Sequence, residues 1–460
     1  MSPSRRRAPV LAVIGGGAAG TLTAIASLWR TSMSVVVVEP RPSLGRGVAY
    51  SSCDPAHRLN VPAGSMSAHP GHPDHFALWA AGNDPAVDGF SFPPRSDYGR
   101  YLADALSQTA ADVAPGRLAH LRAQAASLQR SGGGWSIDLG PAGRLDADQV
   151  VLAVGAGPPA MPAQLPAELR GHPAVIADPW AGDALARLPQ GPILCLGSGL
   201  TAVDVALSAC GWSRSASVLS ISRHGLRPLA HRSGGAPTWV PRLAAGRPAT
   251  ASGLLRAVRA EVALASARGL DWRDAVNGLR PQVPALWGAL PEPEQARLAG
   301  RLGRFWEVHR HRLSPQVAAR VGELERSGRL RFAAARLESV RASGDRLSVR
   351  LAECNGSRTH TVAALVNCTG AVHDVTAQPL LARLHAAGLC RRGQLGLGVA
   401  CDRHGIMLDA MGRPTGLMTL GVLRRGDLWE TTSIPEIRDQ AFAIADALAT
   451  GQRRAVGLAG

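Results

Sequence analysis

The sequence predicts an α/β fold with two dinucleotide-binding, Rossmann-like domains and a helical insertion. Two observations indicate the pair of domains: the glycine-rich turns at residues 15–20 and 197–202 each separate an apolar run from a segment with helical spacing. Continuous apolar runs are typical of parallel strands that are buried on both faces of a sheet. A third observation indicates the insertion: over residues 241–325 the apolar residues recur at helical spacing. A chain of 460 residues is long enough for two or three packed domains.

The first unit has the order strand, turn, helix and strand over residues 10–38. Gly15, Gly17 and Gly20 stand at the three glycine positions of GxGxxG, which provide a tight turn, backbone access to a pyrophosphate and close helix–strand packing. The helix N-terminus adds amide donors for the diphosphate. Glu39 ends the second strand, nineteen residues after Gly20, where a carboxylate can accept both ribose hydroxyls. The unit therefore predicts dinucleotide binding.

The second unit repeats this order over residues 192–222. Gly197, Gly199 and Ala202 stand at the glycine positions of the turn, and the second strand ends at Arg223 instead of an acid. An arginine accommodates a 2′-phosphate that a carboxylate would repel, so the sequence favours NADPH. NADH stays open, because a guanidinium can also lie over an adenine ring. A βαβ unit without a ligand is the structural alternative.

All 50 basic residues are arginines, and the chain has no lysine. This composition excludes a Walker phosphate loop, a kinase-type lysine, a pyridoxal Schiff base and a lysine general base. The formal charge of +16 is typical of proteins that bind nucleic acid. However, the arginines are scattered and aromatic residues make up only 4% of the chain. We therefore expect no nucleic-acid partner.

The seven cysteines form no CxxC pair and have no zinc-ligand spacing, so no metal site and no disulfide framework are expected. Three arginines at residues 5–7 precede an apolar run, but glycines interrupt that run too early for an export signal. No segment approaches the roughly 18 apolar residues of a membrane span. The sequence therefore predicts a cytoplasmic protein that does not bind a membrane. It does not indicate an oligomeric state.

Further motifs extend from the first glycine turn almost to the C-terminus, at residues 15–20, 39–41, 45–50, 57–63, 66–67, 94–95, 98–99, 222–226, 309–312 and 429–438. On these motifs the chain resembles a bacterial family of FAD/NAD(P)-binding flavoprotein monooxygenases. That family includes a FAD-dependent urate hydroxylase and an L-aspartate N-hydroxylase. The chain is more distantly similar to the ornithine and lysine N-hydroxylases of siderophore pathways. The resemblance spans about residues 8–445.

The resemblance implies a FAD domain that is split in sequence around an NAD(P)H domain, which is itself interrupted by the helical insertion. The implied parts are a first FAD part at 8–160, a first NAD(P)H part at 190–240, the insertion at 241–325, a second NAD(P)H part at 326–360 and a second FAD part at 361–450. Strands that end in glycine, at residues 150–155 and 365–370, are expected where the chain crosses between the domains.

The resemblance also implies which residues hold FAD. Glycines of the first turn and the acid after the second strand would hold its ADP part: Gly15, Gly17, Gly20 and Glu39. Residues of two later loops would approach the isoalloxazine or close the cofactor from the C-terminal side: Asn60, Pro62, Met66, Gly421, Thr432 and Pro435. For this second group the alternative is loop geometry, because proline stiffens a loop and glycine permits a positive φ.

A flavin beside a second nucleotide domain is expected to be reduced by NADH or NADPH. Disulfide reductases need a cysteine pair beside the flavin, whereas Cys53 is alone in its unit. The leading hypothesis is therefore a monooxygenase that uses O₂ through a flavin C4a-hydroperoxide and needs no protein nucleophile.

The substrate expected first, from the resemblance, is urate, hydroxylated to 5-hydroxyisourate. A urate anion would suit Arg310, His311 and Arg312, because a guanidinium binds planar oxyanions with two hydrogen bonds. The alternative for these residues is a solvated helix end. The alternative functions are N-hydroxylation of an amino acid or amine, and a flavoprotein that transfers electrons without hydroxylating anything. Trp287 and Trp306 are expected in the core of the insertion.

Overall fold

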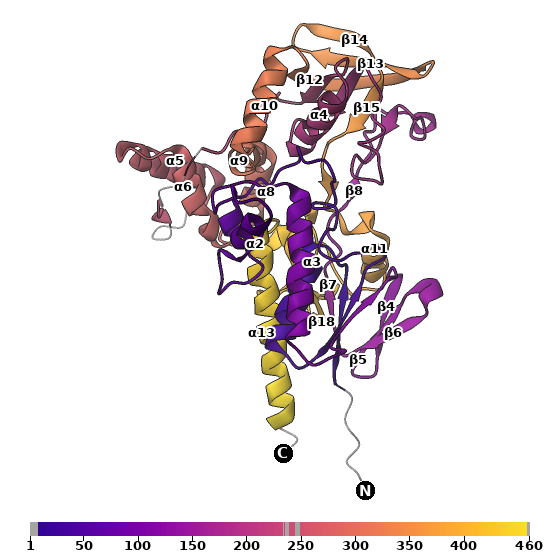
Figure 1. Ribbon diagram of the computed structural model, residues 1–460, viewed down its shortest axis with the longest axis vertical. Coiled ribbons are helices and arrows are strands. Elements are labelled where there is room, and N and C mark those ends of the chain that lie inside the picture. The colour runs from indigo at the N-terminus through magenta and orange to yellow at the C-terminus, as the bar shows by residue number, and fades with distance from the viewer. Residues whose placement is uncertain (1–7, 233, 235–238, 244–248, 458–460) are drawn as a thin grey trace.

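The computed structural model describes residues 8–232, 234, 239–243 and 249–457 of the chain. These residues form an α/β fold with two large sheets, one at each end of the molecule, and a group of helices at one side (Figure 1). The predicted fold class is confirmed. Among the described helices none is long and apolar enough to cross a membrane.

The first sheet contains six strands in the order β17-β18-β7-β1-β2-β3, parallel except for the edge strand β17. Their bounds are β1 Val10–Ile14, β2 Ser34–Val38, β3 Leu118–Leu121, β7 Gln149–Leu152, β17 Ile406–Leu408 and β18 Pro414–Thr419. Every residue of β1 is buried, as its unbroken apolar run predicts for a central strand.

Three helices cover one face of this sheet: α1 Ala18–Arg30, α3 Arg95–Ala111 and α13 Ile434–Gly457. Helix α1 packs against both α3 and α13, and the axes of the two long helices have a similar direction in Figure 1. A small antiparallel sheet and helix α11 cover the other face: β4 Ser127–Ser131, β5 Gly134–Asp138, β6 Arg144–Ala147 and α11 Pro379–Ala386. The first sheet is therefore buried between two layers.

The second sheet contains seven strands in the order β14-β13-β12-β11-β10-β15-β9. Their bounds are β9 Val175–Ile176, β10 Pro192–Leu196, β11 Ser217–Ser222, β12 Leu330–Ser343, β13 Arg346–Glu353, β14 Gly356–Val362 and β15 Ala364–Asn367. Helices α4 (Leu200–Trp212) and α10 (Pro315–Arg326) pack in the core on one face. The second glycine turn lies between β10 and α4, as expected from the sequence.

Two short strands connect the sheets. After β7 the chain enters β8 (Gly157–Pro159), and after β15 it enters β16 (Ala371–Val372). Strands β8 and β16 pair antiparallel. The glycine-ended strands are therefore the points where the chain crosses between the domains, as expected.

Two of the domain boundaries expected from the sequence disagree with the sheet that the segments join in the structure. Strand β15 pairs with β10, so the chain returns to the first domain after Asn367 and not at residue 361. Helix α10, within the interval expected for the insertion, contributes Val317, Val321 and Leu324 to the core of the second sheet. Both segments are apolar on the face that packs there, and only tertiary contacts assign that face to a domain.

The described part of the insertion contains five α-helices, α5 Ala251–Ala267, α6 Trp272–Leu279, α7 Val283–Gly288, α8 Glu292–Arg301 and α9 Gly303–Arg310. The sequence predicts one helix over 295–308, but two short helices meet there at Leu302. Two further short helices, α2 (His75–Asn83) and α12 (Arg425–Leu428), belong to the first domain.

A buried polar cluster joins the two dinucleotide domains. Arg95 of α3 forms two hydrogen bonds with the Asp204 carboxylate of α4, at 2.7 and 3.3 Å. The ring of His57 lies 3.1 Å from the Asp204 carbonyl oxygen and 3.0 Å from the Ser208 hydroxyl. Because these side chains are shielded from water, they fix how α4 sits against the first domain.

Candidate functional site

The first glycine turn leaves room for a ligand because side chains are absent at its three positions. A Cβ on Gly15, whose φ is +101°, would lie 2.5 Å from the Ala153 carbonyl oxygen. A Cβ on Gly20 would lie 1.8 Å from the Gly15 carbonyl oxygen, so α1 packs directly on the turn. Gly17 faces Gly47, and their backbones are close enough that a Cβ on Gly17 would lie 3.3 Å from the Gly47 Cα. These positions match the predicted pyrophosphate turn.

Glu39 lies against this turn at the end of β2. Its Oε2 accepts a hydrogen bond of 2.8 Å from the Gly16 backbone N–H, and its Oε1 accepts one of 3.1 Å from the Arg41 N–H. The side chain is 6% exposed. The turn and the strand end therefore place a carboxylate where the sequence predicts one for a ribose.

A cavity of about 540 Å³ opens beside Glu39 at the end of the first sheet. It is lined by Pro40, by Arg122 to Ala126, by Leu139 to Ala142 and by residues of α11. The segment after β3 did not stand out in the sequence, because only the sheet brings it next to β2. The cavity thus lies next to the strand end that carries Glu39, although neither Glu39 nor the glycine turn lines it.

The loop at residues 57–66 lies between the first domain and the second. The Asn60 carbonyl oxygen is 2.9 Å from Nε2 of His231. Pro62 precedes a short 3-10 turn, and Met66 is buried in the core of the first domain. The structure therefore places Asn60 between the domains, whereas Met66 packs among core residues. A role for these residues beside a flavin stays a prediction.

The C-terminal segment approaches the same edge of the first sheet. Gly421, with φ +69°, is the second residue after β18, and its carbonyl oxygen accepts a hydrogen bond of 3.0 Å from the Thr431 hydroxyl. Thr432 is exposed and Pro435 is in the first turn of α13. The threonine that hydrogen-bonds Gly421 is therefore Thr431 and not the predicted Thr432. Closure of the cofactor by this segment stays a prediction.

The second glycine turn has the same form with one difference. Gly197 has φ +114°, and a Cβ there would lie 2.2 Å from the Cys368 carbonyl oxygen. Gly199 is the N-cap of α4 and has open space around it. At the third position Ala202 is fully buried, so α4 leaves room for one methyl group that α1 does not.

Arg223 follows the end of β11 and is exposed. The neighbouring His224 has a lowered pKa, caused by partial desolvation and by the charges of Arg304, Arg223 and Arg336. The charges of three arginines therefore act on the residue next to Arg223. Arg304 and Arg336 were missed in the sequence because they lie about 80 and 110 residues further on.

The structure brings Arg310 into the buried interior. Its Nε lies 3.2 Å from Glu430 Oε2, and its NH2 donates at 3.4 Å to the Ser433 hydroxyl. His311 lies 3.1 Å from Glu307, and burial lowers the pKa of His311. Both residues are at the C-terminal end of α9, where Arg310 is buried and His311 is partly exposed. Arg310 already has a carboxylate partner, which leaves its neighbour Arg312 as the arginine available to an anion.

Arg312 is 1% exposed, and only one of its three guanidinium nitrogens has a hydrogen-bond partner. Its NH2 donates to Asn277, whereas its Nε and NH1 are buried without a hydrogen-bond partner. Burial, with the nearby charges of Arg310 and Arg273, lowers the pKa of Arg312 to about 10, so it stays charged near neutral pH. Because a buried guanidinium with unpaired donors is costly, these atoms indicate an anionic partner.

His231 lies near this charge and is neutral. Desolvation and the charge of Arg312 lower its pKa to about 4. Since its Nε2 faces the Asn60 carbonyl oxygen, the neutral ring donates there and leaves Nδ1 as an acceptor. His231 therefore contacts the Asn60 loop of the first domain and also feels the charge of Arg312.

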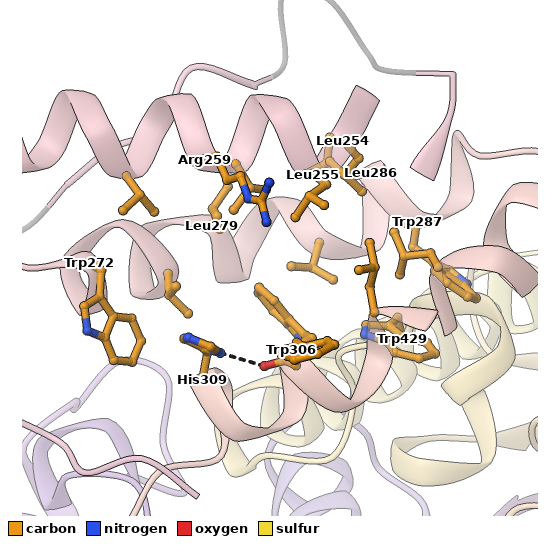
Figure 2. A pocket seen from close by; sticks show the side chains of 17 residues that line it. Leu254, Leu255, Arg259, Trp272, Leu279, Leu286, Trp287, Trp306, His309 and Trp429 are labelled. Carbon is orange, nitrogen blue, oxygen red and sulfur yellow. Dashed lines mark hydrogen bonds between the residues drawn. The ribbon is translucent and has the colours of Figure 1, made fainter. Parts of the chain in front are cut away.

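The expectation for Trp287 and Trp306 is only partly met. Both are in the insertion, but they line a cavity of about 450 Å³ and do not fill a solid core (Figure 2). All seven cysteines are free. Among the described residues no three His, Cys, Asp or Glu side chains gather as a metal site would require.

The chain can be compared with a protein family, with curated proteins and with solved structures. Residues 12–157 match the family model described as FAD-NAD(P)-binding, which covers the first glycine turn and Glu39. This match agrees with the predicted cofactors of the chain, FAD with NAD(P)H as co-substrate. No curated protein matches the sequence of the chain.

Solved structures match over nearly the whole length. The ornithine N-hydroxylase of Kutzneria sp. 744, in a state denoted FADred-NADP+-L-orn, has a TM-score of 0.66 at 14% identity and covers 97% of this chain and 100% of its own. The L-lysine 6-monooxygenase of Pseudomonas syringae has a TM-score of 0.66 at 15% identity, with 96% and 99% covered. The bacillithiol disulfide reductase of Bacillus cereus has a TM-score of 0.58 at 13% identity, with 97% and 100% covered.

These similarities establish the fold, because structures of such low identity share architecture more reliably than activity. N-hydroxylases and a disulfide reductase share this arrangement of two dinucleotide domains. The chain therefore has the fold of these flavoproteins, with an FAD-NAD(P)-binding first domain.

Proposed function

We propose that the chain is a FAD-dependent, NAD(P)H-consuming monooxygenase that N-hydroxylates the amino group of an amino acid or a related amine. The observation that carries the proposal is the shared architecture with the ornithine and lysine N-hydroxylases over 96–97% of the chain. A disulfide reductase is less well supported, because it needs a reactive thiol beside the flavin. Cys53 is exposed and has no cysteine partner.

Each cofactor would bind to one of the two glycine turns and to the residue at the end of the strand that follows it. Gly15, Gly17 and Glu39 would hold the ADP part of FAD, and Gly197 with Arg223 would hold the nicotinamide dinucleotide. When bound, FAD would supply a flavin that NAD(P)H reduces and that activates O₂. The arginines around His224 favour NADPH, since its 2′-phosphate would find charged donors there.

Arg312 would bind an anionic group of the substrate. Its unpaired Nε and NH1 suit a carboxylate, which accepts two parallel hydrogen bonds from a guanidinium. An amino acid supplies both this carboxylate and an amine. The positive charges of Arg310 and Arg312 also disfavour an ammonium nearby, and therefore favour the neutral amine that reacts as a nucleophile.

The burial of this centre is the second contribution of the chain. Arg310, Arg312 and His57 are each at most 5% exposed, so the region between the domains is shielded from water. Exclusion of water protects reactive species from side reactions and strengthens electrostatic interactions inside the site. The neutral His231 adds a proton acceptor, Nδ1, without adding charge.

Hydroxylation of urate to 5-hydroxyisourate is the second candidate. It is supported by the same unpaired donors of Arg312, because urate is a planar anion. The neighbouring structures favour the amine.

A substrate screen tests these proposals. The FAD-loaded protein is mixed with NADPH and O₂ in the presence of ornithine, lysine, aspartate or urate, and NADPH oxidation is followed together with hydroxylamine and 5-hydroxyisourate. We expect oxidation that depends on an amino acid and yields a hydroxylamine. Arg312→Gln should raise KM at least tenfold with the FAD content unchanged, whereas the exposed Arg320→Gln should leave KM unaltered.

Two outcomes would contradict the proposal. Formation of 5-hydroxyisourate alone would replace the amine with urate. Equal NADPH oxidation with and without every substrate, with peroxide as the product, would indicate a flavoprotein that transfers electrons without hydroxylation.

A further inference from the structure

The helical insertion encloses a second candidate site. A cavity of about 450 Å³ lies between α5 on one side and α6 to α9 on the other (Figure 2). Small-molecule sites in proteins typically have volumes of about 300–1,000 Å³. The lining is mostly apolar and consists of leucines and valines of the insertion together with Trp272, Trp287, Phe305, Trp306 and Trp429.

This cavity is distinct from the centre between the two dinucleotide domains. None of the residues predicted to hold FAD or NAD(P)H lines it. Phe305, Trp306 and His309 of α9 line the cavity, whereas Arg310 of the same helix pairs with Glu430. The two regions are neighbours, because the Arg312 guanidinium lies 5.7 Å from the ring centroid of the wall residue Trp272. A ligand of the cavity would therefore not occupy the place of the cofactors.

The aromatic walls are fixed by contacts outside the cavity. Trp306 Nε1 donates at 2.7 Å to Glu430, and Trp287 Nε1 donates at 2.7 Å to the Gly426 carbonyl oxygen. Trp429 stacks on Trp287 with ring centroids 4.6 Å apart. Trp272 lies at the opposite end in Figure 2. The Arg273 guanidinium lies 4.4 Å from the centroid of the Trp272 ring. The rings are thus held in place without a filled space between them, as in a preformed site.

The core of the insertion is divided around this space. One buried cluster is built on Trp239, Ala265 and Ala275, and a separate one on Leu243, Leu279 and Leu286. The apolar residues of α5 that face the cavity are only partly buried. An empty apolar space deprives its lining of dispersion contacts, so an apolar ligand would stabilise the insertion.

The charge at the edge of the cavity is positive. Arg259 is exposed and forms no hydrogen bond or ion pair with any other residue that the structure describes. His309 is the other titratable side chain of the lining, and its Nδ1 is already bonded to the Phe305 carbonyl oxygen. The lining contains no carboxylate. An apolar body in the cavity and an anionic group at Arg259 would complement this surface.

We propose that the cavity of the insertion binds a small amphipathic organic anion, a fatty or arylalkyl carboxylic acid. Its apolar body lies among the tryptophans and leucines, and its carboxylate pairs with Arg259. The site is independent of the proposed N-hydroxylation. Because Trp306 belongs both to the wall and to the Glu430–Arg310 pair, the ligand would contact the same network that orders the centre between the domains.

Calorimetric titration of the FAD-loaded full chain tests the proposal without NAD(P)H or turnover. The probes are decanoate, decan-1-ol and decylamine, which share one chain and differ in the head group. Val258→Phe fills the cavity, and Arg259→Gln removes the charge. Leu264→Phe and Arg256→Gln are matched controls, because both residues are exposed on α5 and neither lines the cavity.

We expect decanoate to bind at one site and at least tenfold more tightly than decylamine. Val258→Phe and Arg259→Gln should each weaken decanoate at least tenfold, and Arg259→Gln should abolish its preference over decanol. The two controls should leave binding unchanged. Arg259→Gln changes an exposed residue, so it keeps the test valid if Val258→Phe does not fold. Tighter binding of decylamine, an unchanged affinity in Arg259→Gln, or no binding of any probe would overturn the proposal.

Discussion

The two dinucleotide-binding units have the same order of elements but differ at two positions. The third glycine of the first turn, Gly20, has no room for a Cβ, whereas Ala202 carries one at the equivalent place. The second strand ends in the buried Glu39 in the first unit and in the exposed Arg223 in the second. In the proposed function the shared backbone would provide the phosphate cradle, and the residue at the strand end would decide which charge the dinucleotide meets.

The largest effect is expected where the two turns differ most in packing. Gly20→Val would place side-chain atoms against the Gly15 carbonyl oxygen, so the turn must shift. We expect loss of bound FAD and destabilisation by at least about 3 kcal/mol. In the second unit Ala202→Gly should keep FAD and cost only about 1 kcal/mol. Flavin absorbance per chain and thermal unfolding measure both. Equal FAD content in the two variants would show that the packing difference does not matter for the cofactor.

The next effect concerns the contact that joins the units. Arg95→Met would leave the Asp204 carboxylate, which is 4% exposed, without its partner. Breaking a buried pair by removing one partner costs about 3–5 kcal/mol. We expect this loss in urea denaturation, and a smaller one when Asp204→Leu is added, because the unpaired charge is then removed. A loss below 1 kcal/mol in Arg95→Met would show that the units are held together elsewhere.

A smaller effect sharpens the difference between the strand ends. Arg223→Ser should raise KM for NADPH about tenfold, since a hydrogen bond to a charged group contributes about 1.5–3 kcal/mol. KM for NADH should change little. Arg341→Ser is the control. Arg341 is an exposed arginine of β12, and its charge is not among those that lower the pKa of His224. An equal change for both nucleotides would remove the assignment of a 2′-phosphate to Arg223.

The smallest effect is a pH dependence of the contact between the units. The folded pKa of His231 is about 4, below its ordinary value of 6.5, so the unfolded chain binds more protons between these values. Stability should therefore be complete above pH 6.5 and fall as the pH drops towards 4. For one group the slope is at most about 1.4 kcal/mol per pH unit. His231→Gln should make the urea denaturation midpoint independent of pH between pH 4 and 6.5. If the midpoint varies with pH as in the original chain, His231 is not the cause of the pH dependence.

The first unit was predictable in detail because its signals are local. A tight turn, a short helix and a strand end need only about thirty consecutive residues, and Glu39 hydrogen-bonds the turn that its spacing predicts. The second unit was equally local up to Arg223. Its remaining charges, Arg304 and Arg336, come from the insertion and from β12, so no spacing along the chain could group them.

The insertion was predictable as helices but not as a site. Apolar residues at helical spacing look the same whether they pack against one another or surround a space. Trp287 and Trp306 were therefore expected in a core, and the structure places them in the wall of a cavity. Likewise, Arg310 and Arg312 are two residues apart, yet Arg310 has a carboxylate partner and Arg312 has unpaired donors.

The sequence by itself determined the α/β class, the two glycine turns, the acid of the first unit and the arginine of the second. Each depends on backbone geometry and charge within a short segment. Only the tertiary structure decided that β15 and α10 belong with the second sheet, that Arg312 is buried with unpaired donors, and that the insertion is hollow. Those features depend on contacts between segments that are far apart in the sequence. The burial of a side chain and its hydrogen-bond partners are set by these contacts and cannot be read from one segment.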